Sequence, residues 1–128
     1  MNASKFIFIL IIGVLSIASC KKDDVAGNGL TGTWVGKWGF QGEALSYDET
    51  WKIKSNGKVE AYDGDGQLYA EGTCSVDGIS FKMQYTPIGK TYSYQFSGLY
   101  HDQLHEIIGT WGESPSSADG GDFEMHKQ

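Results

Sequence analysis

The sequence predicts an all-β domain, an eight-stranded antiparallel up-and-down β-barrel. After residue 30, apolar and polar residues alternate with period two, as they do in strands that have one face against a core. Turn sequences interrupt this alternation about every 11 to 13 residues. A flat meander of eight strands would leave two edges unpaired, and closure into a barrel pairs both of them.

Turn chemistry separates the expected strands. The Asn-Gly pair at 56–57 and the Asp-Gly pair at 77–78 suit two-residue hairpins, because both turn positions need positive φ. The segment DGDG at 63–66 suits a longer turn, and the connection at 113–122 is the long one. We expect strands at residues 31–40, 45–54, 57–63, 68–76, 79–86, 91–100, 104–112 and 121–127.

The alternation assigns each strand an inner face that carries nearly all the aromatic residues of the domain. Each large side chain buried there is worth roughly 1.5–3 kcal/mol, so this face supplies most of the drive for folding. The pattern places two aromatic residues, Tyr62 and Tyr69, on the outer face. The expected inner residues include Trp34, Trp38, Phe40, Tyr47, Glu49, Trp51, Ile53, Val59, Ala61, Ala70, Cys74, Val76, Ile79, Phe81, Met83, Tyr85, Tyr92, Tyr94, Phe96, Tyr100, Ile107, Trp111, Phe123, Met125 and Lys127.

The first 19 residues predict a lipoprotein signal peptide. A short cationic start, an apolar run at 6–17 and a small-residue exit are typical of secretory signals. The run is shorter than the ~20 residues that a membrane-spanning helix needs. The exit IASC resembles a bacterial lipobox, which implies cleavage before Cys20 and lipid on its sulfur. Residues 20–29 then form a lipidated tether, and residues 30–128 form the barrel domain.

The charged residues bear on location and on partners. The run KKDD at 21–24 resembles the surface-export signals of some Gram-negative lipoproteins, although a solvated tether explains it equally. We therefore expect an outer-membrane lipoprotein that faces the cell surface or, alternatively, the periplasm. Ten lysines stand against 16 acidic residues, and no arginine is present. This balance excludes nucleic acid as a partner, because its binders carry basic patches, and leaves the lipid as the membrane link.

The segment GTW at 32–34, near the start of the meander, resembles the G-x-W opening of the calycin superfamily, which holds lipocalins, fatty-acid-binding proteins and avidins. The resemblance implies that Trp34 closes one barrel end and that a basic residue of the last strand, here Lys127, packs across its ring. Such a cation–π contact would contribute about 0.5–2 kcal/mol. The residues after TGTW lack the asparagine and serine of avidins, and no T-D-x-x-Y of lipocalins follows. No branch of the superfamily is therefore assigned.

An eight-stranded barrel is either filled by side chains or holds one small ligand. Glu49 is expected to point inward, and a buried carboxylate must be paired or protonated. Its partner would be Lys37, Lys82 or a tyrosine hydroxyl, or else it would anchor a ligand in a cavity. The residues expected to line a ligand site are Trp38, Glu49, Trp51, Tyr92, Tyr94 and Trp111.

Catalysis and metal binding have little support in the sequence. His101 and His105 are a weak metal candidate, because they flank a turn and structural zinc sites want four ligands. No nucleophile, metalloprotease or phosphate-loop motif is present. Cys74 is expected to be a small buried hydrophobe.

We therefore expect neither an enzyme nor a cofactor, and two functions remain. The first is a module that binds a small apolar or amphipathic ligand inside the barrel. The second is a structural or interaction lipoprotein, whose fully packed barrel contacts another protein through its surface or loops.

Overall fold

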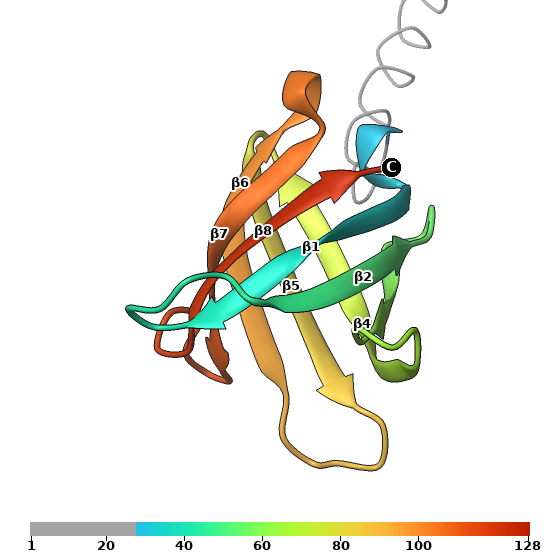
Figure 1. Ribbon diagram of the computed structural model, residues 1–128. Coiled ribbons are helices and arrows are strands. Elements are labelled where there is room, and N and C mark those ends of the chain that lie inside the picture. The colour runs from blue at the N-terminus through green and yellow to red at the C-terminus, as the bar shows by residue number, and fades with distance from the viewer. Residues whose placement is uncertain (1–27) are drawn as a thin grey trace, which may run out of the picture.

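A computed structural model describes residues 28–128, which form a closed barrel of eight antiparallel strands in up-and-down order (Figure 1). The predicted fold class is confirmed. Residues 1–27, with the expected signal peptide, Cys20 and most of the tether, lie outside the described residues. The strands are β1 (Gly32–Phe40), β2 (Tyr47–Ile53), β3 (Lys58–Tyr62), β4 (Leu68–Asp77), β5 (Ser80–Pro87), β6 (Tyr94–His101), β7 (Glu106–Glu113) and β8 (Gly121–Lys127).

Closure comes from β1, which pairs with β2 on one side and β8 on the other. Trp34 in β1 faces both Trp51 of β2 and Lys127 of β8 across the ladders. Two single 3-10 turns complete the described chain, η1 (Asn28–Leu30) and η2 (Asp102–Leu104). Within residues 28–128, no helix has the length and apolar character needed to cross a membrane.

The middle of the barrel is filled by aromatic side chains. Trp51 is almost completely buried and contacts three phenylalanine rings, with centroid distances of 5.9, 5.4 and 5.6 Å. These rings come from β5, β6 and β8, so the contacts join strands on opposite sides of the barrel. The three residues are Phe81, Phe96 and Phe123.

Trp34 closes one end of the barrel together with η1. Its ring is fully buried, and its indole N–H donates to the carbonyl of Leu30 at 2.9 Å. Leu30 is fully buried as well, and Tyr100 contacts the indole edge-on at 6.1 Å between ring centroids. The residues just before β1 therefore act as a lid on the core, at the end where β8 finishes (Figure 1).

Lys127 also contributes to this closed end, by a contact other than the expected one. Its ammonium donates to the carbonyl of Gly29 in η1 at 2.9 Å. The cation–π contact in the described part of the chain is instead Lys52 over the ring of Tyr62, at 4.9 Å. A hydrogen bond thus takes the place of the expected packing of Lys127 across Trp34.

Several residues expected inside are exposed, and all lie where a strand begins or ends. Phe40 is the last residue of β1 and Tyr47 the first of β2, whereas Tyr92 precedes β6 and Ile79 lies in the turn before β5. The expectation of burial is wrong for these four. Alternation predicts which face of the sheet a side chain lies on, but not how far it lies from the end of the barrel. At the barrel mouth the inner face is exposed to solvent.

Tyr69 was expected outside and is turned inward by a β-bulge. Ala61 pairs with Ala70 and Tyr62 with Leu68, so Tyr69 has no partner in β3 and the register shifts there. A bulge of this kind re-aims side chains beyond it. The Tyr69 hydroxyl consequently reaches the carboxylate of Glu49.

Candidate functional site: an aromatic pit above a buried carboxylate

A cavity of about 160 Å³ lies at the barrel end opposite η1. We call it the aromatic pit, since all the residues that line it are aromatic. They come from β1, β4, β5, β6 and β7, so closure of the sheet assembles the site from distant segments of the chain. The lining residues are Trp38, Phe40, Tyr69, Tyr85, Tyr94, Phe96 and Trp111.

Several neighbouring rings of the aromatic pit stand nearly at right angles to one another. Trp38 meets Trp111 at 80° with centroids 5.1 Å apart, and Tyr94 meets Trp111 at 77° and 5.8 Å. Tyr85 meets Tyr94 at 83° and 6.2 Å. This edge-to-face arrangement is favourable because it sets the positive edge of one ring against the negative face of the next. The pit is therefore enclosed by aromatic rings on several sides.

Local contacts fix the two tryptophans of the pit. The indole N–H of Trp111 donates to the carbonyl of Gly39 at 3.1 Å. Gly120 lies directly against the Trp111 ring, since a Cβ at that position would lie 2.4 Å from it. Trp38 stacks on Tyr47 at 4.6 Å and 23°, which covers one face of its ring. These contacts therefore fix the positions of the Trp38 and Trp111 rings in the absence of a ligand.

Glu49 lies behind the hydroxyl groups of the pit. It is only 3% exposed, and its Oε2 accepts hydrogen bonds from the Trp51 indole at 2.6 Å and the Tyr85 hydroxyl at 2.7 Å. Its Oε1 accepts one from the Tyr69 hydroxyl at 2.6 Å. Glu49 also borders a more open hollow beside the pit, together with Trp38 and Tyr69. Two hydroxyl groups thus connect the carboxylate to the cavity.

Glu49 has neutral partners only. Within residues 28–128, no basic side chain lies within ion-pair distance of it, and Lys37 pairs with Asp48 instead. Burial raises the pKa of the Glu49 carboxyl, against the lowering effect of the hydrogen bonds from Tyr69, Trp51 and Tyr85. The expected choice of partners is settled in favour of tyrosine hydroxyls, and among residues 28–128 no cation lies beside the carboxyl group.

The two tyrosine hydroxyls beside Glu49 have fewer protons than the hydrogen bonds that the three groups form. Those of Tyr69 and Tyr85 lie 2.5 Å apart, so three short O···O contacts join the two hydroxyls and the carboxyl group. Two hydroxyl protons serve only two of the three contacts. Burial raises the pKa of both tyrosines, so both hydroxyls stay protonated. A proton on Glu49 would serve the third contact, which agrees with its raised pKa.

The structure brings some of the expected site residues together and not others. Glu49 lies beneath the pit, whereas Trp51 lies deeper, in the packed core. Tyr92 is exposed and reaches only the ring of Tyr94, at 5.7 Å. The expected residues that line the pit are Trp38, Tyr94 and Trp111.

Sequence reasoning did not assign four residues of the pit to a ligand site. Tyr69 depends on the bulge, for which the sequence carries no clear signal. The other three were expected on the inner face, but their depth along the barrel was not known. They are Phe40, Tyr85 and Phe96.

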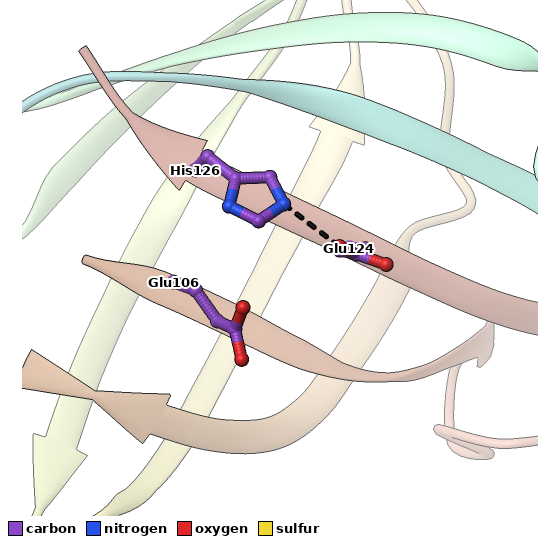
Figure 2. A group of neighbouring side chains, drawn as sticks. All are labelled: Glu106, Glu124 and His126. Carbon is purple, nitrogen blue, oxygen red and sulfur yellow. Dashed lines mark hydrogen bonds and ion pairs between the residues drawn. The ribbon is translucent and has the colours of Figure 1, made fainter. Parts of the chain in front are cut away.

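A second cluster lies on the outer face of β7 and β8. Figure 2 shows the side chains of Glu106, Glu124 and His126, whose ligand atoms all lie within 4.8 Å of one another. The Nε2 of His126 is 2.7 Å from a Glu124 carboxylate oxygen. The three could hold a transition-metal ion, one ligand short of a structural zinc site.

The histidines expected as a weak metal candidate are not part of this cluster. His101 contacts Glu106 at 3.2 Å through its Nδ1, which pairs it with a carboxylate. His105 follows η2 in the left-handed conformation, with φ of 53°. The turn therefore separates the two histidines. The groups that lie close together, Glu106, Glu124 and His126, come from the paired strands β7 and β8.

Comparisons with known proteins found no significant match to this chain among family models, curated proteins or solved structures. Fold alone does not determine function. The function has therefore to be argued from the geometry of the aromatic pit.

Proposed function

We propose that this protein is a calycin-like lipoprotein that binds a small apolar or amphipathic ligand, or one small group of it, in the aromatic pit. The observation that carries the proposal is the box of perpendicular rings with hydroxyl groups at its base. Apolar and aromatic walls with a few placed polar groups are typical of ligand sites.

The size of the pit limits the ligand. Its volume of about 160 Å³ is about half the lower end of the roughly 300–1,000 Å³ range of ligand pockets. Trp51, Phe81 and Phe123 fill the barrel below, so a long acyl chain has no room to enter. The site therefore suits a compact ligand or the end group of a larger one.

The proposed location is the outer membrane of a Gram-negative bacterium, with the cell surface or the periplasm on the side of the barrel. The support is the leader, the lipobox-like IASC and the charged segment after Cys20. The lipid would be the membrane link. Replacing Cys20 by alanine should release the protein from membranes, and continued membrane association of C20A would contradict this part of the proposal.

A ligand screen tests the binding function. Full-length protein in a maltoside detergent would be screened by thermal shift against compact polar and apolar compounds, and by native mass spectrometry for a co-purifying molecule. Ligands that raise the unfolding temperature should lose this effect in Trp38→Leu and keep it in Tyr62→Leu. Tyr62 is the matched control because it lies on the outer face, bonded to Glu60. A stable protein with no ligand and no shift would contradict the proposal.

A protein-contact function is the alternative, and one observation favours it. Four apolar side chains are exposed near β5, β6 and β7, and Leu99 lies directly opposite Ile108 across the ladder. Apolar patches on a surface often mark contact sites. A negative ligand screen, together with loss of a partner from Leu99→Ser protein, would favour this function. The four residues are Ile79, Leu99, Leu104 and Ile108.

A further inference from the structure

We propose that the ligand of the aromatic pit is a small organic cation, a compact alkylated ammonium group, which the ring walls surround and the Glu49 carboxylate attracts. This inference rests on the proposed function, because it names the ligand class of the same site. It follows from the chemistry of the walls, the carboxyl group beneath them and the absence of basic side chains from the lining.

The walls suit a soft cation. Alkylated ammonium groups are attracted to aromatic faces within about 6 Å of the ring centroid, and boxes of aromatic rings are the typical site for them. Trp38, Tyr94 and Trp111 supply three such rings at near right angles. A metal ion is excluded from this position, because hard cations need several oxygen ligands and the lining is aromatic.

The Glu49 carboxyl group beneath the walls has no cationic partner among residues 28–128. Glu49 is bonded to Trp51, Tyr69 and Tyr85, all of them neutral. Electrostatic attraction is strong in such a low-dielectric environment. A cation in the pit would lie one hydroxyl group away from Glu49 and would favour its ionised form.

An anion in the pit would meet no positive charge and would lie beside the Glu49 carboxyl group, and most of the donors around it are already bonded. The indole N–H of Trp111 is bonded to the carbonyl of Gly39, and that of Trp51 to Glu49. The hydroxyls of Tyr69 and Tyr85 are directed to Glu49. Buried anions require hydrogen-bond donors or a positive charge, and no basic side chain lines the pit, so it favours cations over anions.

Calorimetric titration with two matched compounds tests this inference. The probes are choline and its tert-butyl analogue, in which carbon replaces the ammonium nitrogen, so that size is kept and charge is lost. Both would be titrated into full-length protein and into Glu49→Gln, in a maltoside detergent. Choline should bind the original protein at least about tenfold more tightly than its analogue, and the preference should disappear in E49Q.

Each other outcome has a separate meaning. Equal binding of the two compounds by the original protein would overturn the charge inference and leave the proposed function standing. A preference for choline that survives in E49Q would show that Glu49 plays no part, which also overturns it. Binding of the uncharged analogue by E49Q shows that this variant keeps an intact pit. If neither compound binds, the cation inference fails, and the ligand screen decides the proposed function on its own.

Discussion

The hydroxyl oxygens of Tyr69 and Tyr85 lie 2.5 Å apart, and both contact the carboxyl group of Glu49. Tyr69 and Tyr85 lie on the paired strands β4 and β5, and the curvature of the sheet brings Glu49 of β2 to them. Their close approach in a buried position favours a protonated carboxyl group when the pit is empty. Because the protonation of Glu49 changes with pH, this relationship makes the stability of the fold depend on pH. It also makes the charge beside the pit depend on whether Glu49 is ionised.

The first prediction concerns the dependence of stability on pH. The pKa of Glu49 is raised in the folded state, so its stabilising contribution is complete below its unfolded pKa and is lost as pH rises through the folded pKa. Urea denaturation gives the free energy of unfolding of the original protein and of Glu49→Gln. The original protein's value minus that of the variant should be larger at about pH 5 than at about pH 8. Each unit of pKa shift is worth about 1.4 kcal/mol.

Glu60 provides a control of opposite sign. The hydrogen bond from Tyr62 lowers the pKa of this half-buried residue, so its contribution is present above its unfolded pKa and is lost as pH falls through the folded pKa. The comparison with Glu60→Gln should therefore change in the reverse direction, and only when the pH falls below about 4.5, the unfolded pKa of glutamate. If both variants changed with pH in the same direction, the electrostatic description of Glu49 would be wrong.

The second prediction concerns the thiol of Cys74. Burial raises its pKa to about 12, and thiolate is the form that reacts. Iodoacetamide at neutral pH should leave Cys74 unmodified in the folded protein and alkylate it in urea, as measured by mass spectrometry of the peptide that contains it. Rapid alkylation of the native protein would show that β4 opens to solvent near this residue.

The third prediction concerns the closed end of the barrel. Lys127→Met keeps the apolar stem but loses the hydrogen bond to Gly29, and should reduce the free energy of unfolding by about 1–2 kcal/mol. Lys37→Met is the matched control, because its ion pair with Asp48 is exposed and worth about 0.5 kcal/mol or less. Urea unfolding measures both. Equal losses would mean that η1 does not close the core through Lys127.

The fourth prediction concerns the glycine pair where β6 and β7 approach closely. Gly98 lies opposite Gly109, and a Cβ on Gly98 would be 2.4 Å from the carbonyl oxygen of Ile108. Gly98→Ala should therefore cost roughly 1–3 kcal/mol of stability. In Gly64→Ala the nearest atom to the new Cβ would be 3.6 Å away, so this control should change stability by about 0.5 kcal/mol or less. A neutral Gly98→Ala would show that the strands can separate freely there.

Much of the fold could be predicted from the sequence, because period-two alternation and turn residues are local signals. The Asn-Gly pair at 56–57 and the Asp-Gly pair at 77–78 do separate strands, although only the glycine of each pair takes the positive φ expected of both residues. Alternation placed Glu49 inside. The depth of each residue could not be predicted in the same way. Phe40 and Tyr47 share the inner register with buried residues but lie at the mouth, where the barrel ends.

The composition of the site depends on contacts that only the closed sheet creates. Tyr69 faces inward because of one unpaired residue in β4, and a pattern of alternation cannot show such a shift. The cluster of Glu106, Glu124 and His126 depends likewise on the register of β7 against β8. Tryptophans that look equivalent in the sequence differ in depth: Trp34 is sealed under η1 and Trp38 lines the pit.

The central claim is that the aromatic pit receives a small organic cation at Trp38 and Trp111, and the indole N–H signals of the four tryptophans test it most directly. Proton–nitrogen correlation spectra of the full-length protein in a maltoside detergent would be followed during titration with choline. We predict saturable shifts of the Trp38 and Trp111 signals and a constant signal for Trp34, which lies at the closed end. Constant signals for Trp38 and Trp111, or a shift of Trp34 as large as theirs, would contradict the claim.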